Sequence, residues 1–225
     1  MQERAAAYQS SGGLSAGYKD EVSSVLRNTY MLLGMTLAFA ALMAWMSMSL
    51  NLPYPNIIVL LVGFYGLLFA THKLQNSPWA LVTTFALTGF MGYTLGPIIG
   101  MYVSAGAGHI VAQAFTLTAI TFVGLSGYVL VTRKDMSFLS GMIMAGFWVL
   151  LGCMILSFFI STPAFQLAIS GGFAIFSSMI ILFQTSQIIH GGERNYILAT
   201  VTLFVALYNL FISLLNILTA LSGDD

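Results

Sequence analysis

Polar side chains recur along one face of the last long apolar run of the chain. Thr202, Asn209, Ser213 and Asn216 follow one another at helical spacing, in a sequence otherwise rich in Leu, Phe and Val. Hydroxyl and amide groups placed in this way can form hydrogen bonds between helices, or they can line a path for a ligand or ion. Bonding between helices is the more common use. We therefore interpret this polar stripe as a face that meets protein rather than lipid.

Charged side chains are missing from the interior of the long apolar runs. None of the 7 Lys and Arg or the 7 Asp and Glu residues falls well inside a run, although a charge at mid-bilayer usually marks an ion path or proton relay. A conventional carboxylate-driven transporter is therefore disfavoured. His72, His109 and His190 have no spacing that suits a metal, and Cys153 is the only cysteine. We expect no metal and no cofactor.

Two serines stand in motifs that could mark a nucleophile. Ser15, in the GLSAG of residues 13–17, fits a nucleophile elbow but has no strand before it. Ser126, in the GLSG of residues 124–127, resembles the motif of intramembrane serine proteases, where a helix serine meets a histidine; His190 would be that histidine. No oxyanion donor accompanies the pair. An intramembrane serine protease is thus the third hypothesis, and we expect the chain not to be an enzyme.

The composition indicates that most of the chain lies in a lipid bilayer. Of 225 residues, 58% are hydrophobic and 6% are charged, whereas a soluble domain usually carries about 25% charged residues. The net charge is zero, and no basic run suggests a nucleic-acid partner. The partner that composition does imply is the lipid bilayer, and the residue pattern specifies no oligomeric state.

The apolar runs are long enough to cross a bilayer, and turn-forming or charged clusters separate them. The sequence predicts an all-α integral membrane protein with a flexible N-terminal tail at residues 1–27 and a seven-helix transmembrane domain at residues 28–225. The tail contains Met1, Arg4 and Lys19 and could act as a handle for another protein. The predicted spans are residues 29–50, 56–70, 78–99, 109–131, 135–160, 163–190 and 196–221.

The cations fall on one side of this seven-span scheme. The first, third and fifth loops contain none, so the positive-inside rule predicts a cytoplasmic N-terminus and an extracytoplasmic C-terminus. The residues that lie on the predicted cytoplasmic side are Arg4, Lys19, Arg27, Lys73, Arg133, Lys134 and Arg194.

The third predicted span is rich in small residues. Gly89, Gly92 and Gly96 lie close to one face and precede Pro97. Glycines on a membrane helix allow two backbones to approach closely. We interpret this face as tight helix packing rather than as a binding site.

Four blocks of sequence together resemble the Bax inhibitor-1 (transmembrane Bax inhibitor motif) family. They are residues 89–99, 114–122, 188–197 and 208–211, and they include Gly92, Gly96, Pro97, His190, Gly191 and Asn209. Residues 26–30 and 132–139 are most similar to the family's bacterial YccA branch. The resemblance implies a seven-helix fold with a central last helix that the other six surround.

The resemblance also implies two alternative functions. Leak-type members of the family conduct calcium through a proton-sensitive latch of two membrane aspartates, and this chain has Gln184 and Ala206 at those positions. A pH-sensitive cation leak is therefore the second hypothesis. Resemblance to the YccA branch implies that the chain is a client and modulator of the membrane protease FtsH and of its partners HflK and HflC in the bacterial inner membrane. This interaction role, with the tail as the handle, is the first hypothesis.

Overall fold

The computed structural model describes the backbone of residues 2–223 and the side chains of residues 20–223. The described chain forms seven helices and no strand. Each is long and apolar enough to cross a membrane, which confirms the predicted fold class. The helices are α1 (Gln2–Ser49), α2 (Ile57–Leu74), α3 (Trp79–Ser104), α4 (Gly108–Thr132), α5 (Leu139–Leu156), α6 (Pro163–Ile189) and α7 (Tyr196–Ser222).

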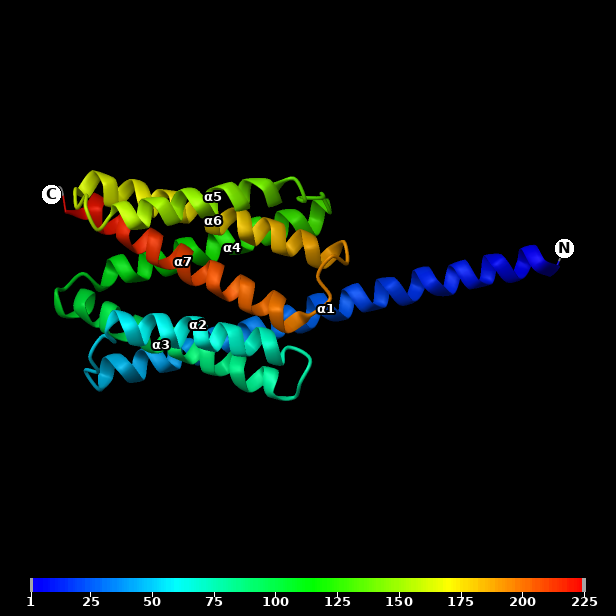
Figure 1. Cartoon of the computed structure of the whole chain (residues 1–225), viewed down its shortest axis with the longest axis horizontal. Helices are drawn as coiled ribbons and strands as arrows, with labels where there is room; N and C mark the ends of the chain where they lie inside the picture. The colour runs from blue at the N-terminus through cyan, green and yellow to red at the C-terminus, as the bar shows by residue number, and fades with distance from the viewer. Residues whose placement is uncertain (1, 224–225) are drawn as a thin grey trace.

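Helix α7 lies at the centre of the bundle, as the family resemblance implies (Figure 1). It packs against α1, α3, α4 and α6, and its core residues include Leu203, Leu210 and Leu215, each 2% exposed or less. Helix α2 packs mainly on α3, and α5 packs mainly on α6. The expectation that all six other helices surround α7 therefore needs correction, because four enclose it and two lie outside them.

The first three helices and the next three repeat one pattern of contacts. Helix α1 packs on α3 and α7 while α2 packs on α3; correspondingly, α4 packs on α6 and α7 while α5 packs on α6. Because each group has an odd number of helices, corresponding helices cross the bundle in opposite directions. The arrangement is that of an inverted repeat around a central seventh helix.

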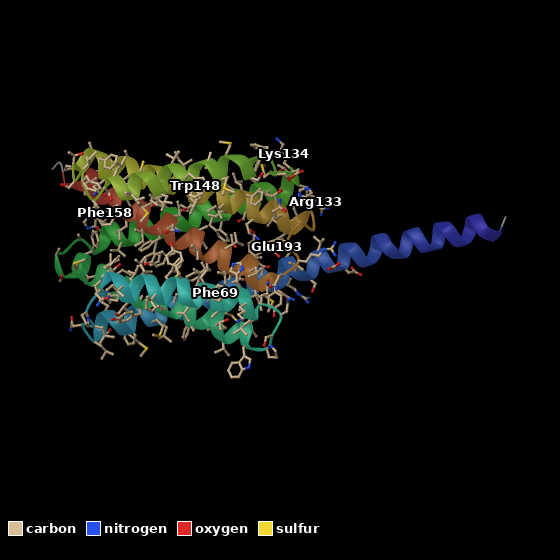
Figure 2. The ribbon with its side chains drawn as sticks, in the orientation of Figure 1. Phe69, Arg133, Lys134, Trp148, Phe158 and Glu193 are labelled. Atoms are coloured by element: carbon tan, nitrogen blue, oxygen red, sulfur yellow. The ribbon has the colours of Figure 1, made fainter. Side chains whose placement is uncertain are left out.

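The described charged side chains gather at one end of the bundle. Arg133, Lys134 and Glu193 lie at the end from which α1 extends (Figure 2). The start of α1 and the end of α7 lie at opposite ends of the molecule (Figure 1), as an odd number of spans requires. This segregation agrees with the pattern from which we predict a cytoplasmic N-terminus, and the orientation stays a prediction.

Several predicted boundaries differ from the structure, including the end of the second span, which reaches Leu74 rather than residue 70, and the end of the fifth, which stops at Leu156 rather than at residue 160. Helix α3 continues past Pro97 to Ser104. Helix α5 begins at Leu139 rather than at Asp135, because the Asp135 carboxylate accepts hydrogen bonds from the backbone and hydroxyl of Ser137 and so caps a turn before the helix. The backbone is also helical from Gln2, so no break separates the described residues 2–27 from the first span. Met1 lies outside the described residues, as do the side chains of Arg4 and Lys19, and the flexibility of the tail stays a prediction.

The glycine face of α3 packs on α1. A Cβ added to Gly92 would lie 2.7 Å from the Ala40 Cα and closer still to the Ala40 carbonyl oxygen. A Cβ on Gly96 would lie 2.7 Å from the Ala44 carbonyl oxygen. The obstacle at Gly92 is the backbone of α1, and at Gly96 it is that backbone together with the Cβ and hydroxyl of Ser47; backbone and Cβ atoms cannot rotate away as the end of a side chain can. This contact supports the interpretation of the glycines as a close helix contact.

Candidate functional site

The polar stripe of α7 does not all face protein. Ser213 is buried, and its hydroxyl donates to the Asn209 carbonyl oxygen at 2.7 Å. Thr202 and Asn209 are half-buried, and Asn216 is exposed. Because successive members of these three are seven residues apart, they lie close to one face, from whose central residue Asn209 the side chain of Ser213 is rotated by about 40°. The interpretation that the whole stripe meets protein is therefore wrong for Asn216.

Both positions that correspond to the family's membrane aspartates lie in the core. Gln184 is 7% exposed and Ala206 is 1% exposed. Neither side chain can titrate, so the structure provides no carboxylate pair at this place. The Gln184 amide nitrogen is buried and finds no hydrogen-bond partner among the described residues.

A chain of hydroxyl groups connects three helices beside Gln184. The Thr185 hydroxyl of α6 lies 3.3 Å from the Tyr30 hydroxyl of α1 and 3.5 Å from the Ser126 hydroxyl of α4. Such contacts between uncharged groups hold membrane helices together by about 0.6 kcal/mol each. Ser126 thus has a structural partner on α6.

His190 bonds to a different set of groups. Its ring nitrogens lie 2.9 Å from the Ser186 carbonyl oxygen and 3.1 Å from the Arg133 carbonyl oxygen. These bonds connect the end of α6 to the turn after α4. The hydrogen bonds of Ser126 and of His190 lead to different groups, so the geometry does not support a serine and histidine dyad.

Ser186 also connects the turn after α4 to α6, and no sequence pattern predicts this contact. It is buried, its hydroxyl accepts from the Met136 backbone N–H at 2.9 Å, and it lies 3.3 Å from the Lys134 carbonyl oxygen. Next to this contact, the hydrogen bonds from Ser137 hold the pKa of Asp135 below its usual range. The turn is thus stabilised by the neutral Ser186 hydroxyl and by the Asp135 carboxylate.

We expect Ser186→Ala to lower the free energy of unfolding by about 1–3 kcal/mol, because it leaves the buried Met136 N–H without an acceptor. Thermal unfolding of the purified protein in detergent measures the change. Ser178→Ala is the matched control on the same helix, since the Ser178 hydroxyl donates only within α6, to the Ala174 carbonyl oxygen. Equal losses in both variants would show that the Ser186 contact is unimportant.

The loop before α7 connects the start of α7 to the loop after α2, at the charged end of the bundle. Asn195 caps α7 by accepting from the Ile197 N–H at 2.9 Å, and its side-chain amide donates to the Gln75 carbonyl oxygen at 3.3 Å. Gly191 has a φ of +70°, which favours glycine. The nearby Arg194 and Glu21 pair at 3.9 Å is exposed and contributes little. The family block at residues 188–197 is therefore a structural turn in this chain.

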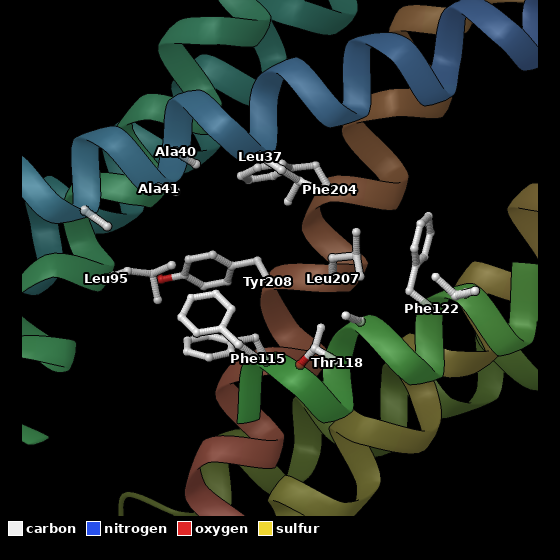
Figure 3. Close-up of a pocket in the computed structure, with 14 residues that line it drawn as sticks. Leu37, Ala40, Ala41, Leu95, Phe115, Thr118, Phe122, Phe204, Leu207 and Tyr208 are labelled. Carbon is white, nitrogen blue, oxygen red and sulfur yellow. The ribbon is translucent and has the colours of Figure 1, made fainter. Parts of the chain in front are cut away.

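Two hollows flank α7, and the sequence reveals neither. The first is a cavity of about 300 Å³ between α1, α3, α4 and α7. Its walls are almost wholly apolar. Figure 3 shows Leu37 on one side of the cavity, Phe115 and Phe122 of α4 on the other, and Tyr208 with its hydroxyl directed toward Leu95. The second is a groove of about 460 Å³ bounded by α2, α3, α5, α6 and α7, with Asn209 in its wall. The Tyr208 hydroxyl lies 2.8 Å from the Thr94 hydroxyl and lines both.

These features define a helical membrane bundle that has no charge in the interior of its spans and no group of His, Cys, Asp or Glu, among the described residues, that could hold a metal. The model of the family described as Inhibitor of apoptosis-promoting Bax1 matches residues 22–223. The chain therefore belongs to the Bax inhibitor-1 family, as the sequence blocks indicated.

Bacterial relatives are similar over nearly their whole length. A protein of Pseudomonas aeruginosa is 63% identical over 91% of this chain and 93% of its own. The Escherichia coli K12 protein called modulator of FtsH protease YccA is 56% identical over 89% of this chain and 91% of its own. A relative in Escherichia coli O6:H1, with the same identity and coverage, is called inner membrane protein YccA. The prediction of a multi-pass bacterial inner-membrane protein is confirmed.

Proposed function

We propose that this chain binds an FtsH-type membrane protease and modulates it as a slowly processed client in membrane-protein quality control. The observation that carries the proposal is the backbone of α1, which extends far beyond the bundle at the charged end (Figure 1). The name of the Escherichia coli relative supports the identity of the partner. HflK and HflC are included as further partners on the family resemblance.

The extended part of α1 suits an initiation site for an unfolding enzyme. It contains Gly12, Gly13 and Gly17, and each glycine in a helix interior costs about 1 kcal/mol relative to alanine. Most of the stability of a helix in a protein comes from packing against other elements, which a segment that extends beyond the bundle does not have. Such a segment opens easily and can enter a narrow pore as an extended chain.

The bundle that follows the handle resists unfolding. Pulling on the tail acts first on α1, which packs against α3, α6 and α7 and buries Leu32, Leu33 and Ala40. Removing α1 separates the close glycine contact with α3 and exposes the central helix. A chain that engages quickly and unfolds slowly occupies the protease and so inhibits it.

The two other hypotheses receive less support. The contacts of Ser126 and His190 described above do not form a catalytic dyad, and the Escherichia coli relative is named as a modulator of a protease. We therefore propose that the chain is not an enzyme. For the cation leak, the buried Gln184 and Ala206 replace the groups that would sense protons.

The binding step is tested by crosslinking in intact bacterial membranes followed by affinity isolation. The full chain is compared with a chain that lacks residues 2–18, a deletion that spares the buried Val25 and the Glu21 contact. We expect the protease subunit with the full chain and a clear reduction without the tail. Isolation of other intact membrane complexes, without the protease in either sample, would contradict the proposal.

A further inference from the structure

The cavity between α1, α3, α4 and α7 is open on one side, between α1 and α4. Both helices pack on α7, but they make almost no contact with each other. Leu37 of α1 and Phe115 and Val123 of α4 line the cavity and are 39%, 47% and 68% exposed. Leu207 and Phe211 of α7 also line it, and both are buried. The cavity therefore has its floor on α7 and its opening between the two other helices (Figure 3).

Small side chains create the space in this cavity. Ala41 of α1 and Ala119 of α4 line it from its two sides, and both are exposed. Longer side chains at either position would extend into the gap. The cavity has a volume of about 300 Å³. A methylene group is similar in size to a water molecule, which takes about 30 Å³ in the liquid, so there is room for a run of about ten methylene groups.

The polar groups in the cavity wall are already paired. Thr118 and Tyr208 carry the only hydroxyl groups among the lining residues. The Thr118 hydroxyl donates to the Ala114 carbonyl oxygen at 2.7 Å within α4, and the Tyr208 hydroxyl lies 2.8 Å from the Thr94 hydroxyl. The remaining surface is hydrocarbon, and an apolar cavity of this kind does not take up water. The ligand that matches these walls is a hydrocarbon chain.

The depth of the opening indicates where such a chain comes from. The lining residues of α7 run from Phe204 to Phe211, in the middle of the span Tyr196–Ser222. Those of α4 run from Phe115 to Val123, in the middle of the span Gly108–Thr132. At this depth the medium outside the helices is the hydrocarbon core of the bilayer, which the acyl chains of phospholipids form. The opening therefore lies directly against acyl chains.

We propose that this cavity binds one acyl chain of a membrane phospholipid, inserted between α1 and α4 and in contact with α7. Because α1 and α4 are the first helices of the two repeats and touch α7 but scarcely each other, the bound chain fills the space between the repeats. It thus adds packing that holds α1 to the rest of the bundle. The proposal stands independently of the proposed function.

The test uses phospholipid vesicles in which a small fraction of the lipid carries a photoreactive diazirine in the middle of one acyl chain. After irradiation, mass spectrometry locates the labelled residues. We expect label on Leu207 and Phe211, which are 6% and 3% exposed and line this cavity but not the groove on the other side of α7. Phe69 of α2 is 69% exposed and reports labelling from the surrounding bilayer. Label on Phe69 without label on Leu207 or Phe211 would overturn the proposal.

Filling the cavity tests whether the acyl chain occupies this space. Ala119→Phe should lower the label on Leu207 and Phe211 about tenfold, because a phenyl ring and an acyl chain cannot share one closely packed volume. Ala41→Leu fills the cavity from the opposite wall and should lower the label too, which keeps the test decisive if the first variant does not fold. Ala112→Phe is the matched control, since Ala112 is exposed on α4 and lies outside the cavity. Wild-type labelling in folded Ala119→Phe or Ala41→Leu protein would contradict the proposal.

A second set of vesicles separates the two sources of such a chain. It contains the same photoreactive chain as a free fatty acid, at the same molar fraction. We expect the phospholipid probe to label Leu207 at least as strongly as the free fatty acid does. Label from the free fatty acid alone would overturn the assignment to phospholipid.

Discussion

Replacing Gly92 with alanine is expected to lower the free energy of unfolding by about 3 kcal/mol, the upper range for overpacking in a close contact. The added methyl group would meet the Ala40 Cα and carbonyl oxygen of α1. Relief requires α1 and α3 to separate, which disturbs the packing of both on α7. The change is measured by thermal unfolding in detergent, and Gly92→Leu is expected to abolish assembly of the bundle.

Gly127→Ala on α4 is the matched control, because a Cβ there meets nothing within 4 Å. We expect this variant to keep or slightly raise the stability, since alanine is the better helix former. A Gly92→Ala protein as stable as Gly127→Ala would show that the backbones of α1 and α3 are not in close contact.

Liposomes that contain the wild-type chain are expected to show no pH-dependent cation flux. The double variant Gln184→Asp with Ala206→Asp should gain a flux severalfold above that background, because a pair of carboxylates shares protons and changes charge with pH. The measurement is dye-reported calcium entry between about pH 5 and pH 8.

The uncharged double variant Gln184→Asn with Ala206→Ser controls for altered packing at the same two positions. It should behave as the wild type does. A wild-type chain that itself conducts cations with a dependence on pH would favour the leak hypothesis over the interaction role.

The spans could be predicted from the sequence because membrane insertion depends on local composition. Seven apolar runs with no interior charge have no alternative stable placement in water. The prediction that the fifth span starts at Asp135 was wrong because Asp135 can cap either a helix or a turn. The buried hydrogen bond from the Met136 N–H to the Ser186 hydroxyl favours the turn. That bond joins residues 50 positions apart, and no local pattern reveals it.

The candidate site was less accessible to sequence reasoning than the fold. Helical spacing placed Thr202, Asn209 and Asn216 on one face, but the direction of that face depends on where the neighbouring helices lie. The groove and the cavity beside Tyr208 arise from three or more helices together. Asn195 could have been found, since an Asn directly before an apolar run is a common helix cap.

The central claim is that the chain restrains an FtsH-type protease as a slowly unfolding client. Its most direct test is the turnover of a reporter membrane substrate by the reconstituted protease, with the full chain or the chain lacking residues 2–18 in the same vesicles. The account predicts that the full chain slows reporter turnover and that the shortened chain, still folded, does not. Unchanged turnover with the full chain, or equal slowing by both, would contradict it.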